Sequence, residues 1–152
     1  MGTSRAFLRA PMARFDAEPF DPEVSRAGAR AVRVLIAEDE FLVAVQVEED
    51  LRSAGCSIVG PFNTLETATQ AARRERFDLA VLDINLNGDM VYPLADELSA
   101  RGVPFIFLSG YVSGDLPARF RRSPQLTKPH DPAALSREIQ TAVSSRRAVA
   151  GC

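Results

Sequence analysis

Three acidic side chains follow two short apolar stretches, and together they could bind a cation. Glu38 and Asp39 come directly after residues 32–37, and Asp83 comes directly after residues 79–82. In a parallel α/β sheet, ligands bind at the carboxyl ends of the strands, so these acids would meet in one crevice. Carboxylates held that close repel one another unless a hard cation lies among them, and oxygen ligands suit Mg²⁺. The spacing therefore predicts a magnesium site.

Two further polar residues follow strand-like runs and add a hydroxyl and an ammonium group at the same edge. Ser109 follows residues 103–108, and Lys128 follows residues 125–127. An acidic metal site with these two groups beside it could hold a phosphoryl group. Each residue taken alone also has a plainer interpretation, because acids favour the first turn of a helix and serine and lysine are ordinary at strand ends. The prediction therefore depends on the whole set in register.

A sheet must position these residues, and the sequence alternates strand-like and helical segments from residue 31 onward. Short apolar runs predict five strands, at residues 32–37, 56–59, 78–82, 103–108 and 125–127. Apolar residues at helical spacing predict helices at residues 40–54, 63–76, 91–101 and from 132, with a short frayed helix at 113–122. Five β/α units predict a single-domain α/β fold. We expect a flavodoxin-like doubly wound (βα)5 parallel sheet with strand order 2-1-3-4-5.

Local signals predict where several elements begin and end. Gly60-Pro61 is expected to end the second strand, and Asn63 with Glu66 resembles a capping box at the start of the second helix. Asp131 is expected to cap the last helix, which we expect to end before residues 144–152.

Composition restricts the class of protein. The chain has 152 residues, 46% of them hydrophobic, and a formal net charge of −2, so no basic field indicates nucleic-acid binding. No apolar stretch approaches the length of a membrane-spanning helix, which predicts no membrane insertion. Cys56 and Cys152 have no metal-binding spacing, which favours a reduced cytoplasmic location. We expect a flexible or irregular extension at residues 1–31, a folded domain at 32–145 and a tail at 146–152.

The chain resembles the receiver domain of two-component response regulators at five positions, in order along its strands: Glu38, Asp39, Asp83, Ser109 and Lys128. The resemblance covers residues 32–145. Residues 82–86 and 104–111 resemble more particularly the FAT GUY branch of stand-alone, single-domain receivers. That branch has Phe-Ala-Thr-Gly-Tyr after its fourth strand, where this chain has Leu108 and Ser109 in place of Ala and Thr. Serine keeps the hydroxyl that the chemistry needs.

The resemblance implies a Mg²⁺-dependent phosphoryl acceptor. Asp83 would be the nucleophile that takes a phosphoryl group from the phosphohistidine of a histidine kinase, with an HWE-type or related kinase as the partner. Asp39, Asp83 and the backbone carbonyl of Asn85 would bind Mg²⁺ directly, and Glu38 would bind it through water. The chain would be an acceptor with autodephosphorylation and not a turnover enzyme.

Other positions of the family would govern contacts and switching. Lys128 and Ser109 would contact phosphoryl oxygens, while Asn85 and Tyr111 would flank the phosphoryl group and tune its lifetime. Many receivers have Tyr or Phe three residues before the strand-5 lysine, where this chain has Gln125, a lack that the FAT GUY branch shares. We therefore hypothesise that residues 110–122 form the bistable element, since they include glycines, a proline and few apolar anchors.

The output stays open between two routes, because residues 144–152 are too few for an effector module. The phosphorylated domain would bind a downstream protein partner, as a monomer or weak dimer, or it would drain phosphoryl groups from a kinase as a phosphate sink. One alternative is a phosphorylation-independent pseudo-receiver, against which the complete set of five residues argues. Another is a haloacid-dehalogenase-type phosphatase, but Asp83-Ile84-Asn85 lacks the second acid that such enzymes use as general acid and base.

Overall fold

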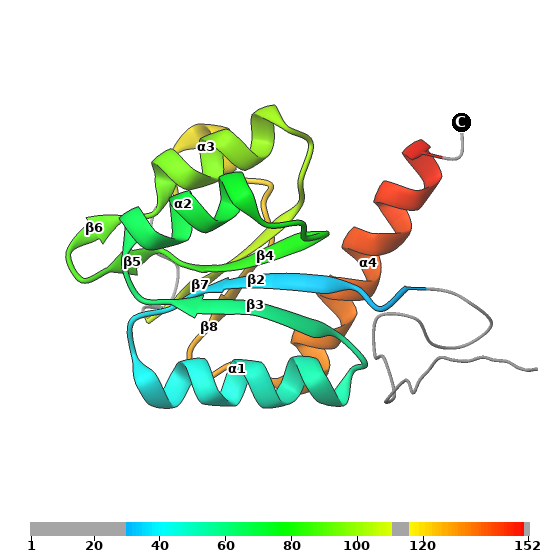
Figure 1. Ribbon diagram of the computed structural model, residues 1–152, viewed down its shortest axis with the longest axis horizontal. Helices are drawn as coiled ribbons and strands as arrows, with labels where there is room; N and C mark the ends of the chain where they lie inside the picture. The colour runs from blue at the N-terminus through cyan, green and yellow to red at the C-terminus, as the bar shows by residue number, and fades with distance from the viewer. Residues whose placement is uncertain (1–29, 111–115, 151–152) are drawn as a thin grey trace, which may run out of the picture. The chain divides into compact units, whose positions relative to one another are not determined.

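The computed structural model describes residues 30–110 and 116–150, and its centre is a five-stranded parallel sheet (Figure 1). In spatial order the strands are β3 (Ser57–Phe62), β2 (Arg33–Ala37), β4 (Leu79–Asp83), β7 (Phe105–Ser109) and β8 (Gln125–Thr127). All four neighbouring pairs run parallel. The predicted order 2-1-3-4-5 and the doubly wound α/β fold are confirmed.

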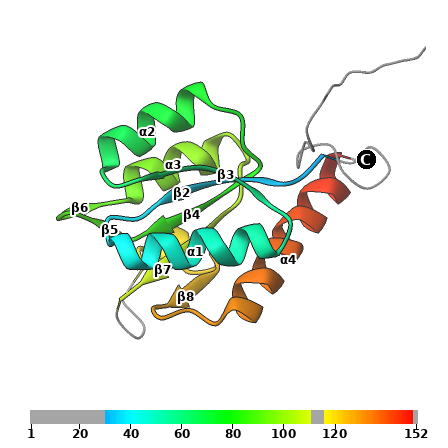
Figure 2. The same ribbon diagram turned by 60° about the horizontal axis from the view of Figure 1, so that its bottom comes forward.

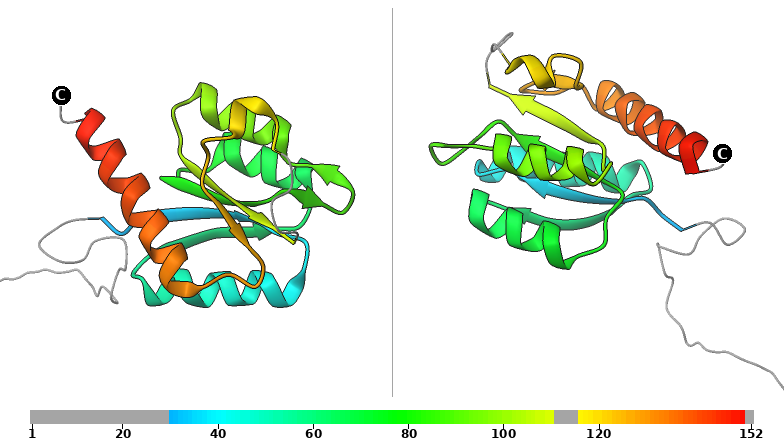
Figure 3. Two further views of the ribbon diagram at one scale, coloured as in Figure 1. Left: turned by 180° about the vertical axis from the view of Figure 1, so that it is seen from behind. Right: turned by 90° about the horizontal axis from the view of Figure 1, so that it is seen from above.

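Helices cover both faces of the sheet. Helices α1 (Phe41–Ser53) and α4 (Pro132–Ala150) lie on one face, and α2 (Leu65–Arg74) and α3 (Tyr92–Ala100) lie on the other (Figures 1 and 3). Side chains alternate between the two faces along each strand. On β2, for example, Leu35 belongs to the core under α2 and α3, and Ile36 belongs to the core under α1 and α4. The sheet is therefore buried on both faces, which explains the continuous apolar runs of its strands.

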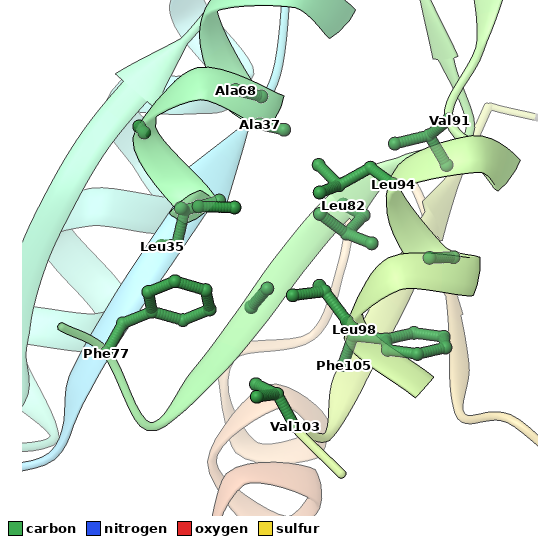
Figure 4. Packing of buried hydrophobic residues seen from close by; sticks show 14 of the residues in the cluster. Leu35, Ala37, Ala68, Phe77, Leu82, Val91, Leu94, Leu98, Val103 and Phe105 are labelled. Atoms are coloured by element: carbon green, nitrogen blue, oxygen red, sulfur yellow. The ribbon is translucent and has the colours of Figure 1, made fainter. Parts of the chain in front are cut away.

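The core under α2 and α3 contains the larger share of aromatic rings. Leu94 and Leu98 of α3 pack with Leu82 of β4 and Phe105 of β7 in this cluster (Figure 4). Phe120, which follows β7 in the sequence, is only 2% exposed. Its ring centroid lies 5.7 Å from that of Tyr92 and 5.5 Å from that of Phe107. The short segment around Phe120 is thus anchored in the core by this aromatic ring.

The core under α1 and α4 is aliphatic. Val47 and Leu51 of α1 and Leu135 and Ile139 of α4 pack against strand residues that point the other way, namely Val34, Ile36, Leu79, Val81, Ile106 and Leu108. Ala44 of α1 is also buried, whereas Ala54 is exposed. Ala54 follows the last turn of α1, where the helix leaves the sheet.

Three predicted boundaries are wrong for local reasons. Strand β3 continues through Gly60-Pro61, because it is an edge strand, where a proline leaves no ladder bond unmade. Thr64, and not Asn63, is the N-cap of α2, since its hydroxyl accepts a hydrogen bond of 3.1 Å from the Thr67 N–H. Helix α4 continues to Ala150, beyond its expected end.

Two other segments differ from the sequence analysis. Residues Asn85–Leu86 (β5) and Asp89–Met90 (β6) form a two-stranded antiparallel hairpin that the apolar pattern did not predict. The frayed helix expected at 113–122 is a 3-10 turn, η2 (Ala118–Phe120), as far as it falls within the described residues. Most of the predicted extension, residues 1–29, and the last two residues of the predicted tail lie outside the described residues.

Candidate functional site

The three predicted acids lie together at the carboxyl ends of two adjacent strands. Glu38 and Asp39 follow β2 and Asp83 ends β4, and these strands are paired so that Ala37 lies opposite Leu82. One carboxylate oxygen of each acid lies within 4.8 Å of the others. Glu38 is 2% exposed and Asp83 is 5% exposed, whereas Asp39 is half-buried. The sheet thus forces three carboxylates into one partly buried pocket.

The donor set of this pocket fits a hard divalent cation. Every candidate ligand atom is a carboxylate oxygen, which is the ligand type that Mg²⁺ prefers. Glu38 Oε1 lies 3.0 Å from Lys128 Nζ, but it is buried and receives no hydrogen bond of normal geometry from any described residue. A buried oxygen in that state retains acceptor capacity for a cation or for a water molecule on it.

Lys128 supplies the positive charge of the pocket. Its ammonium group lies 3.0 Å from Asp83 Oδ2, 3.0 Å from Glu38 Oε1 and 2.7 Å from Glu40 Oε1. The lysine side chain is 10% exposed, so its contacts with Asp83 and Glu38 are largely desolvated, whereas the Glu40 side chain is 62% exposed. Glu40 was not among the predicted site residues. Nothing in the sequence distinguishes Glu40 from its neighbours Glu38 and Asp39 as a contact of the lysine.

The crowding of charges changes the acidity of these groups. Burial raises the pKa of Asp83 to about 8, and the nearby Glu38 and Asp39 carboxylates add to the rise, while Lys128 opposes it. Burial acts to lower the pKa of the Lys128 ammonium, but its contacts with the carboxylates of Glu40, Glu38 and Asp83 outweigh burial and raise that pKa. Burial also acts to raise the pKa of Asp39, but hydrogen bonds with Asp83 and the backbone of Asn87 lower it on balance. Asp83 is therefore harder to ionise than an ordinary aspartate when no cation is bound.

Ser109 ends β7 beside the acidic pocket, as predicted. Leu108, the preceding residue, lies opposite Asp83 in the sheet register. The Ser109 carbonyl accepts a hydrogen bond of 2.8 Å from the Lys128 N–H, so strands β7 and β8 carry the serine and the lysine as neighbours. Ser109 is 5% exposed.

The β5–β6 hairpin forms one wall of the site. Its turn residues Asn87 and Gly88 have positive φ angles of 52° and 94°, as in a type I′ turn. The Asn87 N–H donates a 2.9 Å hydrogen bond to Asp39 Oδ2, and the Asn85 N–H donates one of 3.3 Å to Asp83 Oδ1. The Asn-Gly pair is a strong hairpin signal that could have located this wall from the sequence, although strands of two residues show no alternation.

Of the remaining predicted positions, Gln125 is not brought into the acidic cluster. Gln125 begins β8, opposite Phe107, where it is half-buried. Tyr111 lies outside the described residues. His130, which is not among the predicted site residues, contacts Asp50 of α1.

The fold and the site together define a flavodoxin-like α/β domain with an acidic cation pocket and a buried lysine at the carboxyl ends of its strands. The chain belongs to the response regulator receiver domain family, whose model matches residues 34–140. It is 32% identical over 121 residues to the transcriptional regulatory protein PdtaR of Mycobacterium tuberculosis, a match that covers 77% of this chain and 59% of that protein. The chain thus spans less than two thirds of the length of the curated relatives that it matches.

Solved receiver structures have the same fold. SdrG of Sphingomonas melonis Fr1 is 32% identical with a TM-score of 0.68, and the match covers 74% of this chain and 97% of SdrG. The BeF3-activated conformation of SdrG (Pseudomonas melonis Fr1) is 33% identical with a TM-score of 0.63, over 74% and 97% of the two chains. The anti-anti-sigma factor PhyR of Bartonella quintana is 26% identical with a TM-score of 0.68, over 80% of this chain and 51% of PhyR.

Among residues 30–110 and 116–150, none of the helices has the length and apolar character needed to cross a membrane.

Proposed function

We propose that this protein is a cytoplasmic, single-domain response regulator of the FAT GUY type that accepts a phosphoryl group on Asp83 from a histidine kinase. The observation that carries the proposal is the position of the Asp83 carboxylate. It is buried among two other acids, within 3.0 Å of the ammonium group of Lys128. In this role the chain is a phosphoryl acceptor with autodephosphorylation and not a turnover enzyme.

The transfer forms an acyl phosphate. A carboxylate oxygen of Asp83 attacks the phosphorus atom of a phosphohistidine, the P–N bond breaks, and the departing imidazole nitrogen keeps the electron pair and takes up a proton. Since a carboxylate attacks an anionic group here, positioning and charge neutralisation supply most of the catalysis. Lys128 pairs with one phosphoryl oxygen, and the Ser109 hydroxyl donates a hydrogen bond to another. Asn85 and Tyr111 flank the phosphoryl group and govern the access of water.

Mg²⁺ is the cofactor that this donor set supports. Asp39, Asp83 and the backbone carbonyl of Asn85 would hold the ion directly, and Glu38 would hold it through a water molecule. The bound ion neutralises negative charge on the phosphoryl oxygens and on the crowded carboxylates. The buried Glu38 oxygen described above supports this assignment.

Phosphorylation by a small donor tests the proposal. The protein is incubated with acetyl phosphate and Mg²⁺, and intact mass is compared for wild type, Asp83→Asn and wild type with EDTA. We expect one added phosphoryl group in wild type with Mg²⁺, and none in Asp83→Asn or in wild type with EDTA. If folded wild type gains no mass from acetyl phosphate or from a histidine kinase of the HWE or a related type, the proposal fails in favour of a phosphorylation-independent interaction module.

The output of the phosphorylated domain is protein contact or phosphate traffic. The relative PhyR of Bartonella quintana is an anti-anti-sigma factor, which supports contact with a downstream protein. Reconstituted phosphotransfer separates the two routes. A phosphate sink takes phosphoryl groups from a kinase in competition with a second regulator, whereas a contact regulator binds its partner protein only when it is phosphorylated.

Residues 110–122 are the proposed switch. The described part of this segment is held by the Phe120 ring and by the ion pair between Arg119 and Asp96, which has an N–O distance of 2.7 Å. The existence of a BeF3-activated conformation of SdrG supports the use of beryllofluoride as a phosphoryl mimic. Hydrogen exchange should show lower or higher protection of residues 110–122 with the mimic, and equal protection in both states would exclude this segment as the switch.

A further inference from the structure

A buried histidine joins the loop after β8 to helix α1. His130 Nε2 lies 2.6 Å from Asp50 Oδ2, and the His130 side chain is only 2% exposed. The other oxygen of Asp50 accepts a 3.0 Å hydrogen bond from Gln46, one turn earlier on α1. The Asp50 side chain is 14% exposed. The contact therefore has a defined geometry and limited access to solvent, unlike an ordinary surface ion pair.

The position of this contact relates it to Lys128. His130 follows Lys128 by two residues, and α1 begins directly after the acidic run at residues 38–40. On the other side of the lysine, the Lys128 N–H donates to the Ser109 carbonyl at 2.8 Å. On the far side of His130, Asp131 caps α4, since its carboxylate accepts a 3.1 Å hydrogen bond from the Ala133 N–H. Figure 2 shows α4 beside α1.

We propose that His130 and Asp50 are positioning residues that fix the backbone of residues 128–131 against α1 and so place the Lys128 ammonium group in the acidic pocket. A lysine side chain has four rotatable bonds, so the location of its charge depends on how firmly its backbone is held. Two of the acids that it contacts, Glu38 and Glu40, lie in the run just before α1, and the histidine holds that helix near its other end. Since Lys128 acts in phosphoryl transfer, this inference rests on the proposed function.

The composition makes the test unusually direct. Lys128 is the only lysine in the chain and His130 is the only histidine. In protein labelled with ¹⁵N-lysine, one side-chain ¹⁵Nζ signal therefore reports the surroundings of Lys128 without assignment, and it does so before any phosphodonor is added. The variants are His130→Phe, which removes the ring nitrogen, and Asp50→Asn, which weakens the contact because a neutral amide replaces the charged acceptor. Glu48→Gln is the matched control, because Glu48 lies on the same helix in an exposed pair with Arg52.

We expect the ¹⁵Nζ signal of His130→Phe to move from its wild-type position towards that of a free lysine, with a smaller move for Asp50→Asn and none for Glu48→Gln. The rate of phosphorylation by acetyl phosphate should fall about tenfold in His130→Phe, since a displacement of about 1 Å costs up to about 100-fold. In a Lys128→Met background, His130→Phe should cause no further loss of rate. A purely structural role would instead lower the rate by the same factor in both backgrounds.

Each outcome has a distinct meaning. An unchanged ¹⁵Nζ signal in folded His130→Phe, or in folded Asp50→Asn together with an unchanged rate, overturns the positioning role. A moved signal with a reduced rate supports it. If wild type takes up no phosphoryl group from any donor, the proposed function fails, while the ¹⁵Nζ signal still decides whether the pair positions the lysine. If His130→Phe does not fold, Asp50→Asn carries the test in the same two measurements.

Discussion

Replacing the proposed phosphoacceptor should make the protein more stable when no divalent cation is present. In Asp83→Asn, a neutral amide of the same shape takes the place of a buried carboxylate. Burial and the carboxylates of Glu38 and Asp39 raise the pKa of Asp83 to about 8, so ionising this group in the folded protein is unfavourable. The folded protein therefore gains free energy of unfolding when the charge is removed.

The size and the sign follow from proton linkage. In the folded state Asp83 binds its proton up to about pH 8, whereas in the unfolded chain it loses the proton near the usual aspartate pKa of 3.8. The folded state thus binds more protons between these values, and the free energy of unfolding falls as pH rises through this window. About three pKa units at pH 7 correspond to an upper limit of about 4 kcal/mol. Screening by water reduces this, and we expect Asp83→Asn to gain about 2 kcal/mol.

Urea unfolding in EDTA tests the reasoning at several pH values. We expect the gain of Asp83→Asn over wild type to be small at about pH 4 and to grow up to about pH 8. Added Mg²⁺ should then stabilise wild type more than the variant, because it binds the folded state through the carboxylate that the variant lacks. An Asp83→Asn protein that is less stable than wild type in EDTA at pH 8 would refute the argument, since it would mean that Asp83 makes net favourable contacts.

Three further substitutions probe the lysine of this pocket and the packing of the fold. Lys128→Met should lower the free energy of unfolding by about 3 kcal/mol in EDTA, because the buried carboxylates lose the ammonium group that they contact. This effect is opposite in sign to that of Asp83→Asn, and equal stability of the variant and wild type in urea unfolding would contradict it. Phe120→Ala should cost about 3 kcal/mol in the same assay, since it removes a ring that is 2% exposed, and a cost below about 1 kcal/mol would show that the cavity collapses. Gly60→Ala should lower the melting temperature, because Gly60 has a φ of +108° and a Cβ there would lie 2.9 Å from the Phe62 ring. An unchanged melting temperature would show that β3 relaxes to accommodate the methyl group.

Much of the fold could be predicted because it depends on patterns within short windows. Strands buried on both faces appear as apolar runs, and a parallel sheet places the residues after such runs at one edge. The positions of the strand ends were therefore enough to predict a shared site for five residues, namely Glu38, Asp39, Asp83, Ser109 and Lys128. The edge strand β3 did not follow the pattern, because a glycine and a proline usually end a strand but are tolerated at a sheet edge.

The contacts that could not be predicted join residues far apart in the sequence. His130 and Asp50 are 80 residues apart, and Lys128 and Glu40 are 88 residues apart. Nothing in a local window indicates such a pair, since a lone histidine in a loop and an acid in a helix each fit a solvent-exposed surface equally well. These pairs depend on how α1 and the loop after β8 meet, which only the packed structure specifies.

Charge balance links the stability of this domain to its proposed chemistry. The pocket and its edge hold one lysine and four carboxylates, those of Glu38, Asp39, Glu40 and Asp83, so the lysine alone leaves an excess of negative charge. A divalent cation would offset that excess. An arriving phosphoryl group would add negative charge again, which the lysine and the cation together could neutralise. The same repulsion that costs the folded protein stability therefore favours cation binding and makes the position of the single ammonium group decisive. A contact such as that between His130 and Asp50, which never reaches the phosphoryl group, can govern transfer because the ammonium group it positions has no substitute among the side chains described here.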